Sequence, residues 1–298
     1  MSTITGLHIP LVTPFDAAGR VDLAALERLA HHCLGNGADG LVALGTTAEA
    51  PTLSAAEQDA IVDCCAAVCT ARGVPLTVGA GGNDTAAAVR EVERRSAQSG
   101  VDALLSVVPP YSRPSTAGVV AHFERLAAAS AVPLLVYEVP LRTGIRLGSA
   151  ALLELHAAAP TIAGVKLAVA AFDDDALELL AAAPPSFAVL AGEDQQIFSI
   201  AAAGGSGAIA AAAHCETARF AALLSAVERG ELASARAHAW ALRPLVRALF
   251  AEPNPAVIKA MLHAEGLIPT ADVRLPLTRA SRVAVEAATT ALAPHIPA

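Results

Sequence analysis

The chain has 298 residues, of which 54% are hydrophobic and 16% are charged. This composition is ample for a sizeable core and excludes an intrinsically disordered chain, and the length allows one large domain or two ordinary ones. The net charge of −8 at pH 7 is not opposed by any basic stripe. We therefore expect neither nucleic acid nor an anionic membrane as a partner.

The chain carries no sign of a membrane span or of secretion. No run of about 18 apolar residues is free of Gly, Pro and charge. The first residues, Met1–Thr5, lack the basic start and the apolar core of a signal peptide. We therefore expect a cytoplasmic protein.

Five cysteines show no Cys-x-x-Cys spacing. Cys65 and Cys69 share one face of a predicted helix, which leaves a metal pair as an alternative, but no His or carboxylate stands at ligand spacing. We expect reduced, buried thiols and no metal site.

Strand-like runs alternate with helix-like runs along the first 230 residues. The predicted strands are His8–Thr13, Gly40–Gly45, Pro75–Ala80, Ala103–Val108, Pro133–Val139, Ile162–Ala168, Phe187–Gly192 and Ser206–Ala211. The predicted helices are Asp22–Asn36, Ser54–Ala71, Asp84–Gln98 and Phe172–Ala182, with others starting at Ser115, Ser149, Asp194 and about Glu216. In the second of these helices, Ser54 and Glu57 have the spacing of a capping box.

Eight successive strand–helix units predict the α/β class and an eightfold (β/α) TIM barrel. A doubly wound sheet is the alternative, but the chain has no Gly-x-Gly-x-x-Gly turn after its strands. Beyond Gly230 the pattern is helical only, over Glu231–Phe250, Pro255–Glu265 and Thr278–Leu292. We expect residues 1–230 to form a barrel with the active site, and residues 231–298 to form a C-terminal helical extension of the same domain.

The sixth predicted strand carries Lys166, one of only two lysines beside 18 arginines. Lysine is the cation that can lose its proton and become a nucleophilic amine. At an ordinary pKa of about 10.4, roughly one amine in 2,500 is neutral at pH 7, and burial of a lysine raises that fraction. The sequence therefore predicts a nucleophile; the alternative is a lysine that snorkels to water or pairs with a carboxylate.

Other polar residues follow the strands at what would be the active face of a barrel. The second strand runs into Gly45-Thr46-Thr47-Ala48-Glu49, whose hydroxyls and backbone N–H groups suit a small carboxylate; a helix N-cap is the alternative use of such a turn. The only two tyrosines, Tyr111 and Tyr137, lie after the fourth strand and on the fifth, and Arg142 follows. We expect these phenols to transfer protons.

With these residues in place, the chain resembles the pyruvate-dependent class I aldolases of the dihydrodipicolinate synthase and N-acetylneuraminate lyase family, nearly end to end. The shared motifs are Gly45-Thr46-Thr47-x-Glu49, Tyr137-x-x-Pro140-x-Arg142-Thr143-Gly144, Gly164-Val165-Lys166, Gly192-Glu193-Asp194 and Gly204-Gly205-x-Gly207-x-Ile209. Two late segments look like the synthase branch in particular, Glu252-Pro253-Asn254-Pro255 and Leu275-Pro276-Leu277-Thr278.

The resemblance implies four catalytic residues. Lys166 would form an imine with the keto carbon of pyruvate, and Tyr137 would pass protons during the reaction. Thr46 would link Tyr137 by hydrogen bonds to Tyr111, which in this family reaches in from a neighbouring subunit. A homo-oligomer, a tetramer or a dimer, is implied through this role of Tyr111.

The resemblance also implies the residues that bind substrate. Thr47, together with Thr46, would hold the carboxylate of pyruvate, and Gly192 and Ile209 would line the same pocket. Arg142 would clamp the carboxylate of the second substrate, for which a bidentate guanidinium is well suited.

The activity implied is that of a lyase that forms a Schiff base and condenses pyruvate with L-aspartate 4-semialdehyde, in lysine and diaminopimelate biosynthesis. No metal or organic cofactor is needed, because the protonated imine is itself the electron sink.

Four positions depart from the family pattern. Leu167 and Val169 stand where the synthases commonly have a carboxylate and Ser or Thr, Glu138 replaces a usual Asn, and Ala48 replaces a glycine and would crowd its turn. These changes keep open a related aldolase or dehydratase that acts on a 2-keto-3-deoxy sugar acid or a similar keto acid.

Two further alternatives come from other classes of protein. A pyruvate-binding paralogue without activity would have lost a reacting residue, and none is lost here. A barrel for phosphorylated substrates would use Gly204–Gly207, but no Lys or Arg follows that loop until Arg219.

Some synthases of this family are inhibited by L-lysine at an allosteric pocket. In this chain Ala55, Ala87 and Pro110 replace the His, Glu and Tyr of that pocket, and only Asn83 remains. We predict that millimolar L-lysine leaves the activity nearly unchanged. A titration of initial rate in which millimolar L-lysine abolished activity would contradict this.

Overall fold

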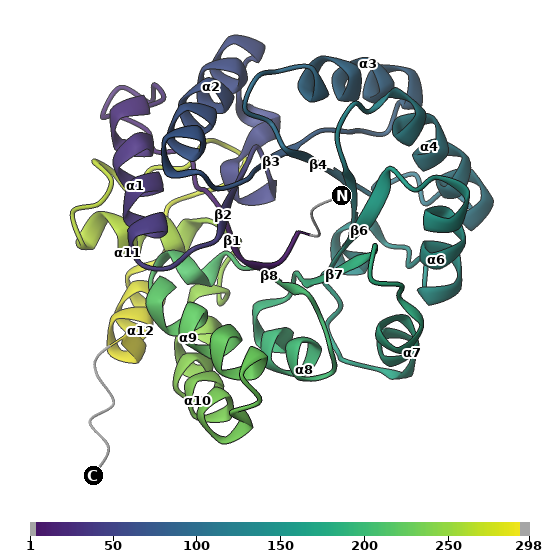
Figure 1. The fold of residues 1–298 in the computed structure, drawn as a ribbon. Coiled ribbons are helices and arrows are strands. Elements are labelled where there is room, and N and C mark those ends of the chain that lie inside the picture. Colours follow the sequence, from purple (N-terminus) through teal and green to yellow (C-terminus); the bar gives the residue numbers. More distant parts are fainter. Residues whose placement is uncertain (1–3, 293–298) are drawn as a thin grey trace. The chain divides into compact units, whose positions relative to one another are not determined.

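The computed structural model describes residues 4–292, and its eight strands follow one another in the order β1 to β8 as a closed parallel barrel (Figure 1). This confirms the predicted eightfold (β/α) TIM barrel, and helices follow the last barrel strand as expected. The density of internal contacts divides the chain into two compact units. The first unit is Met1–Gly6 with Pro75–Ile209, and the second unit is Leu7–Val74 with Ala210–Ala298.

The first unit contains six of the barrel strands, and each of them is buried along nearly its whole length. Its strands are β3 (Leu76–Gly79), β4 (Ala103–Val107), β5 (Leu134–Glu138), β6 (Ile162–Leu167), β7 (Ala188–Ala191) and β8 (Gly207–Ile209). Its helices are α3 (Thr85–Ser96), α4 (Thr116–Ala129), α5 (Pro140–Thr143), α6 (Ser149–Ala158), α7 (Asp174–Ala182) and α8 (Ile197–Ala202), with the 3-10 turn η3 (Asp194–Gln196). Figure 1 shows α3, α4, α6 and α7 on the outer side of these strands. Helices cover the outer face, so the strands read as apolar runs without alternation.

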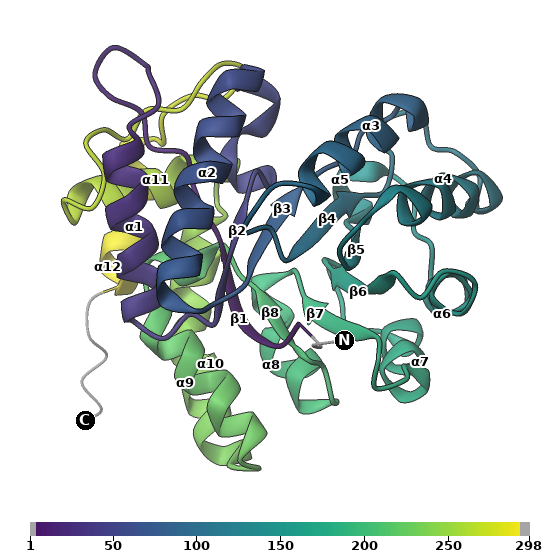
Figure 2. The ribbon, with the colours of Figure 1, turned by 45° about the horizontal axis from the view of Figure 1, so that its top comes forward.

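The second unit contains the parallel pair β1 and β2 and the C-terminal helices. Its elements are β1 (Gly6–Pro10, whose first residue belongs to the first unit), α1 (Leu23–Gly35), β2 (Gly40–Ala43), α2 (Ala55–Arg72), α9 (Thr217–Glu228), α10 (Leu232–Leu249), α11 (Ala256–Ala264) and α12 (Arg282–Leu292), with the 3-10 turns η1 (Thr46–Ala48), η2 (Ala50–Thr52) and η4 (Ala212–His214). Figure 2 shows α9 and α10 packed side by side. The predicted capping box of α2 is present, with Ser54 and Glu57 each accepting from the other's backbone N–H.

A few element bounds differ from those predicted. The first strand begins at Gly6, two residues earlier than expected, and α12 begins at Arg282, where the Ser281 hydroxyl accepts from the Ala284 N–H. The short helix α5 lies in a segment for which no helix was predicted; it starts with Pro140 and is capped after Thr143 by Gly144, whose φ of +76° suits glycine. None of the helices within residues 4–292 has both the length and the apolar character to cross a bilayer. The assignment of residues 231–298 to the same domain as the barrel stays a prediction.

Gly207 shows why one strand end requires glycine. Its φ is +150°, and a Cβ built on it would lie 2.6 Å from the Gly6 backbone nitrogen. The Gly6 N–H donates to the Ser206 carbonyl at 3.0 Å. A side chain at Gly207 would therefore separate the two backbones that meet there.

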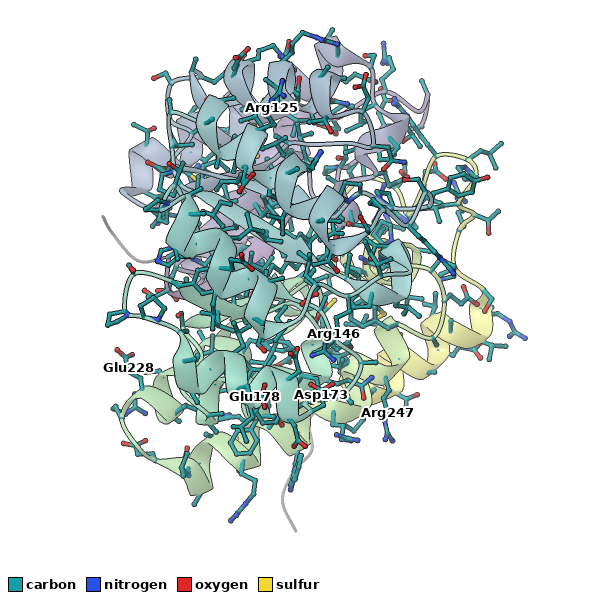
Figure 3. The ribbon with its side chains drawn as sticks, turned by 90° about the vertical axis from the view of Figure 1, so that its right-hand side faces the viewer. Arg125, Arg146, Asp173, Glu178, Glu228 and Arg247 are labelled. Atoms are coloured by element: carbon teal, nitrogen blue, oxygen red, sulfur yellow. The ribbon has the colours of Figure 1, made fainter. Side chains whose placement is uncertain are left out.

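Glu138, the last residue of β5, is a buried carboxyl that holds the loop after α5. It is 1% exposed, and its Oε1 accepts from the N–H groups of Leu147 at 2.5 Å and Gly148 at 3.2 Å. Its Oε2 has no hydrogen-bond partner among the described residues. Burial raises the pKa of Glu138, while the two N–H donors and the charge of Arg146 oppose the rise. Arg146 is held in turn by Asp173, with a shortest distance of 2.5 Å (Figure 3).

We predict that Glu138→Gln makes the free energy of unfolding fall less steeply as the pH rises. Because the pKa of Glu138 is higher in the folded state than in the unfolded state, folding binds its proton, and the stability it contributes falls as pH rises through that raised pKa. Gln keeps the acceptor for both N–H groups and does not titrate. The free energy of unfolding of Glu138→Gln relative to wild type, from urea denaturation, should therefore increase between about pH 4 and about pH 8.

A suitable control is Glu154→Gln, because Glu154 is an exposed residue of α6 in the same unit. Its free energy of unfolding relative to wild type should not change with pH over that range. If the difference in free energy of unfolding between Glu138→Gln and wild type were also independent of pH, Glu138 would not have a raised pKa in the folded protein.

Candidate active site

Lys166 is buried in β6 beside Tyr137 of β5. The two residues are partners in the parallel register, and the Lys166 Nζ lies 4.2 Å from the centroid of the Tyr137 ring. Lys166 is only 6% exposed, and no carboxylate among residues 4–292 lies within ion-pair distance of it. The ion-paired lysine, one of the alternatives considered for this position, is therefore excluded within the described chain, and the burial of the residue argues against the other.

Gly192, directly after β7, leaves the space that the lysine side chain occupies. A Cβ at this position would lie 2.7 Å from the Lys166 Cγ and 3.1 Å from the Ala168 Cβ. Lys166 and Ala168 therefore share a face, as strand alternation predicts. Leu167 and Val169 are buried on the other side, at 1% and 4% exposure. Their departure from the family pattern thus lies away from the amine.

Glu193 is a residue to which the sequence analysis gave no role, although it stands in the Gly192-Glu193-Asp194 motif. Burial raises the pKa of Glu193, and the positive charges of Lys166 and Arg142 oppose that rise. The carboxylate therefore lies within electrostatic reach of both cations. The Gly192-Glu193-Asp194 motif could have indicated a role for Glu193, but the sequence does not show which way the Glu193 carboxylate faces.

The remaining predicted residues of the first unit differ widely in exposure. Tyr137 and Ile209 are buried, at 7% and 1% exposure. Arg142 is exposed on α5, and Tyr111 is 92% exposed in the loop after β4 with a φ of +68°. The first unit thus brings Lys166, Tyr137 and Gly192 into contact, and leaves the phenol of Tyr111 open to solvent in the single chain.

The Thr46–Thr47 turn belongs to the second unit and follows β2. Gly45 precedes the 3-10 turn η1 and makes no side-chain cap, while α2 is capped by Ser54, so the threonines do not cap an α-helix. Thr46 is exposed, whereas Thr47 is 3% exposed, and its Oγ1 accepts from the Nδ2 of Asn254 at 2.9 Å. The alternative use of this turn, as a helix N-cap, is thereby excluded.

Ala48 lies in the turn without a positive φ. The residues of this loop with positive φ are Leu44 at +54° and Glu49 at +57°, and Ala48 is not among them. The Ala48 carbonyl accepts from the Thr13 hydroxyl at 2.7 Å. Alanine is therefore compatible with a position where the family has glycine.

The second lysine, Lys259, is also buried, but it is paired. Its Nζ lies 2.8 Å from the Glu49 Oε1, and both side chains are 0% exposed. Burial lowers the pKa of Lys259, and the carboxylate of Glu49 opposes that change. Lys259 therefore has the environment of a structural ion pair, unlike Lys166. The sequence analysis gave it no role, because the contact spans most of the chain.

The described residues do not suggest a metal centre. No group of three or more His, Cys, Asp or Glu side chains within residues 4–292 is placed to hold a metal ion. The five cysteines are free thiols; Cys33, Cys65 and Cys69 are buried, and the other two are half-buried. The first unit offers instead an amine, a phenol and a carboxylate, which are groups for nucleophilic and acid–base catalysis.

Three comparisons place the chain among known proteins. A 4-hydroxy-tetrahydrodipicolinate synthase of Moorella thermoacetica is 39% identical over 272 residues, which cover 91% of each chain. The crystal structure of dihydrodipicolinate synthase from Thermotoga maritima matches with a TM-score of 0.93 at 31% identity and covers 98% of each chain. The chloride-inhibited dihydrodipicolinate synthase of Acinetobacter baumannii, complexed with pyruvate, matches with a TM-score of 0.92 at 32% identity, covering 97% of this chain and 98% of that one.

The model of the Dihydrodipicolinate synthetase family matches residues 3–293, nearly the whole sequence. The motifs and the barrel of this chain agree with this match and with these relatives. The chain therefore belongs to the dihydrodipicolinate synthetase family.

Proposed function

We propose that this protein is a lyase of the 4-hydroxy-tetrahydrodipicolinate synthase type, which condenses pyruvate with L-aspartate 4-semialdehyde in lysine and diaminopimelate biosynthesis. The observation that carries the proposal is the buried Lys166, which has no carboxylate at ion-pair distance among residues 4–292 and lies against Tyr137. A lysine in this environment is suited to capture a keto acid as an imine.

The chemistry begins with attack of the Lys166 Nζ on the keto carbon of pyruvate, and the keto oxygen leaves as water. The protonated imine then withdraws electrons, so a methyl proton leaves and an enamine forms. The enamine carbon bonds to the aldehyde carbon of the second substrate, whose oxygen takes up a proton. Finally the amino group of that substrate replaces Lys166 at the imine carbon, which closes the ring and frees the lysine.

Tyr137 is the group best placed to move protons in these steps. Its ring lies beside the amine, and it is 7% exposed, so few water molecules compete with its hydroxyl. A phenol near the reacting nitrogen can donate a proton to the leaving oxygen and later take one back. In this proposal Thr46 connects it to Tyr111.

The two substrate carboxylates take different residues. Thr47 and Thr46 bind the carboxylate of pyruvate, with Gly192 and Ile209 as lining residues of the same pocket. Arg142, exposed on α5, binds the carboxylate of the semialdehyde. An exposed guanidinium suits a substrate that arrives second, because it remains accessible once pyruvate is bound.

We also propose that the chain acts as a homo-oligomer, a tetramer or a dimer. The supporting observation is Tyr111, which is 92% exposed and held at a φ of +68°. An exposed tyrosine on a strained backbone is unusual unless a partner covers it. In a second copy of the chain this phenol would complete the proton path.

We predict that the semialdehyde is the preferred partner of pyruvate. The value of kcat/KM for the condensation should exceed that for cleavage of any of a panel of 2-keto-3-deoxy sugar acids by at least about 100-fold. Lys166→Ala should abolish both reactions. This result would show that both activities arise at the same active site. A larger kcat/KM for a keto-deoxy sugar acid would assign the protein to the related aldolases instead.

A further inference from the structure

The C-terminal segment contacts the predicted carboxylate-binding turn through Asn254, which lies between α10 and α11. The Asn254 Nδ2 donates to the Thr47 Oγ1 at 2.9 Å, a contact between residues 207 positions apart. Asn254 is half-buried, and its Oδ1 has no hydrogen-bond partner among the described residues. The contact with Thr47 is therefore the interaction that fixes this amide within the described chain.

This hydrogen bond has a direct consequence for the Thr47 hydroxyl. A threonine hydroxyl has one proton to donate, while its oxygen can accept. Because the oxygen accepts from the Asn254 amide, the hydroxyl proton stays available for another acceptor. An ionised carboxylate can only accept, so Thr47 is preset as a donor to it.

The two residues that follow Thr47 in the turn are held by contacts of their own. The Thr13 hydroxyl donates to the Ala48 carbonyl, and the Glu49 carboxylate accepts from Lys259 at 2.8 Å and from the Arg274 backbone N–H at 2.7 Å. Glu49 keeps a φ of +57° under these contacts. A non-glycine residue persists in this conformation only where its surroundings determine it. The backbone of the turn is therefore rigid, but these contacts do not determine the orientation of the Thr47 hydroxyl.

We propose that Asn254 is a positioning residue that orients the Thr47 hydroxyl as a donor to the keto-acid carboxylate. The inference rests on the proposed function, since it names the group that prepares the pyruvate site. Asn254 acts through Thr47 and not on the reacting atoms. The C-terminal extension thus contributes to the substrate site and is not only a packing element.

The test compares Asn254→Asp and Asn254→Ala with wild type in the full-length protein. The readout is the pyruvate concentration that gives half-maximal trapping of the imine by borohydride, beside the KM for the semialdehyde. The Asp side chain has nearly the same shape, but it accepts the Thr47 proton and adds a negative charge. The half-saturating pyruvate concentration should rise at least about tenfold in Asn254→Asp and about threefold or more in Asn254→Ala.

Several quantities should remain as they are in wild type. The trapped fraction at saturating pyruvate and the KM for the semialdehyde should stay within about twofold, because neither depends on the Thr47 proton. Asn36→Asp is the matched control, since Asn36 is exposed at the end of α1 and undergoes the same change of charge. It should bind pyruvate as wild type does.

A double-mutant cycle with Thr47→Val distinguishes an effect of Asn254 through the Thr47 hydroxyl from a general disturbance of the turn. Once the hydroxyl is gone, Asn254→Ala should raise the half-saturating pyruvate concentration by less than about twofold further. The defect of Asn254→Asp relative to wild type should also lessen as the pH falls toward the range in which a carboxyl is protonated, because the neutral acid can donate again.

Distinct outcomes separate the two proposals. If wild type is not trapped by pyruvate, the proposed function fails. If wild type is trapped but both Asn254 variants bind pyruvate within twofold of it, or if their effects add fully to that of Thr47→Val, the role of Asn254 is refuted. If Asn254→Asp does not fold, Asn254→Ala and the cycle decide alone.

Discussion

The structure depends on one buried amine that meets no carboxylate at ion-pair distance among residues 4–292. The chain has two lysines, and both are buried, but only one meets a carboxylate at ion-pair distance within residues 4–292. Lys259 and Glu49 form a closed pair whose Nζ also lies 4.0 Å from the centroid of the Phe15 ring. Removal of either member of such a pair leaves an uncompensated charge and costs about 3–5 kcal/mol, which is ample reason for a structural lysine. Lys166 has no such ion pair among the described residues, and this difference supports the chemical role that we propose for it.

The surroundings of Lys166 follow from its position in a parallel sheet. The strand on one side presents a phenol in register with it, and the strand on the other side is followed directly by a glycine whose missing side chain leaves room for the lysine. The backbone of β6 is fixed on both sides by ladder hydrogen bonds, so the amine is presented from a rigid element. Preorganisation of this kind lets a reactive group work without reorganisation during the reaction.

The barrel and a special role for Lys166 could be predicted from the sequence because both produce local signals. Each strand is a short apolar run between turn residues, and a lysine within such a run is conspicuous in a chain that uses arginine elsewhere. The four-residue helix α5 was missed because it is too short to show helical periodicity. Asn254 and Lys259 were given no site role because their partners, Thr47 and Glu49, lie more than 200 residues away in the chain. Contacts of this range leave no trace in spacing or periodicity.

The most direct test of the central claim is to identify the amine that captures pyruvate. The protein is reduced with borohydride in the presence of pyruvate, digested and mapped by mass spectrometry, with Lys259 as the internal comparison. We predict one pyruvate-derived adduct per chain, on the peptide that contains Lys166, and no modification of Lys259. An adduct on Lys259 or on the α-amino group with Lys166 unmodified, or no adduct at all, would contradict the account.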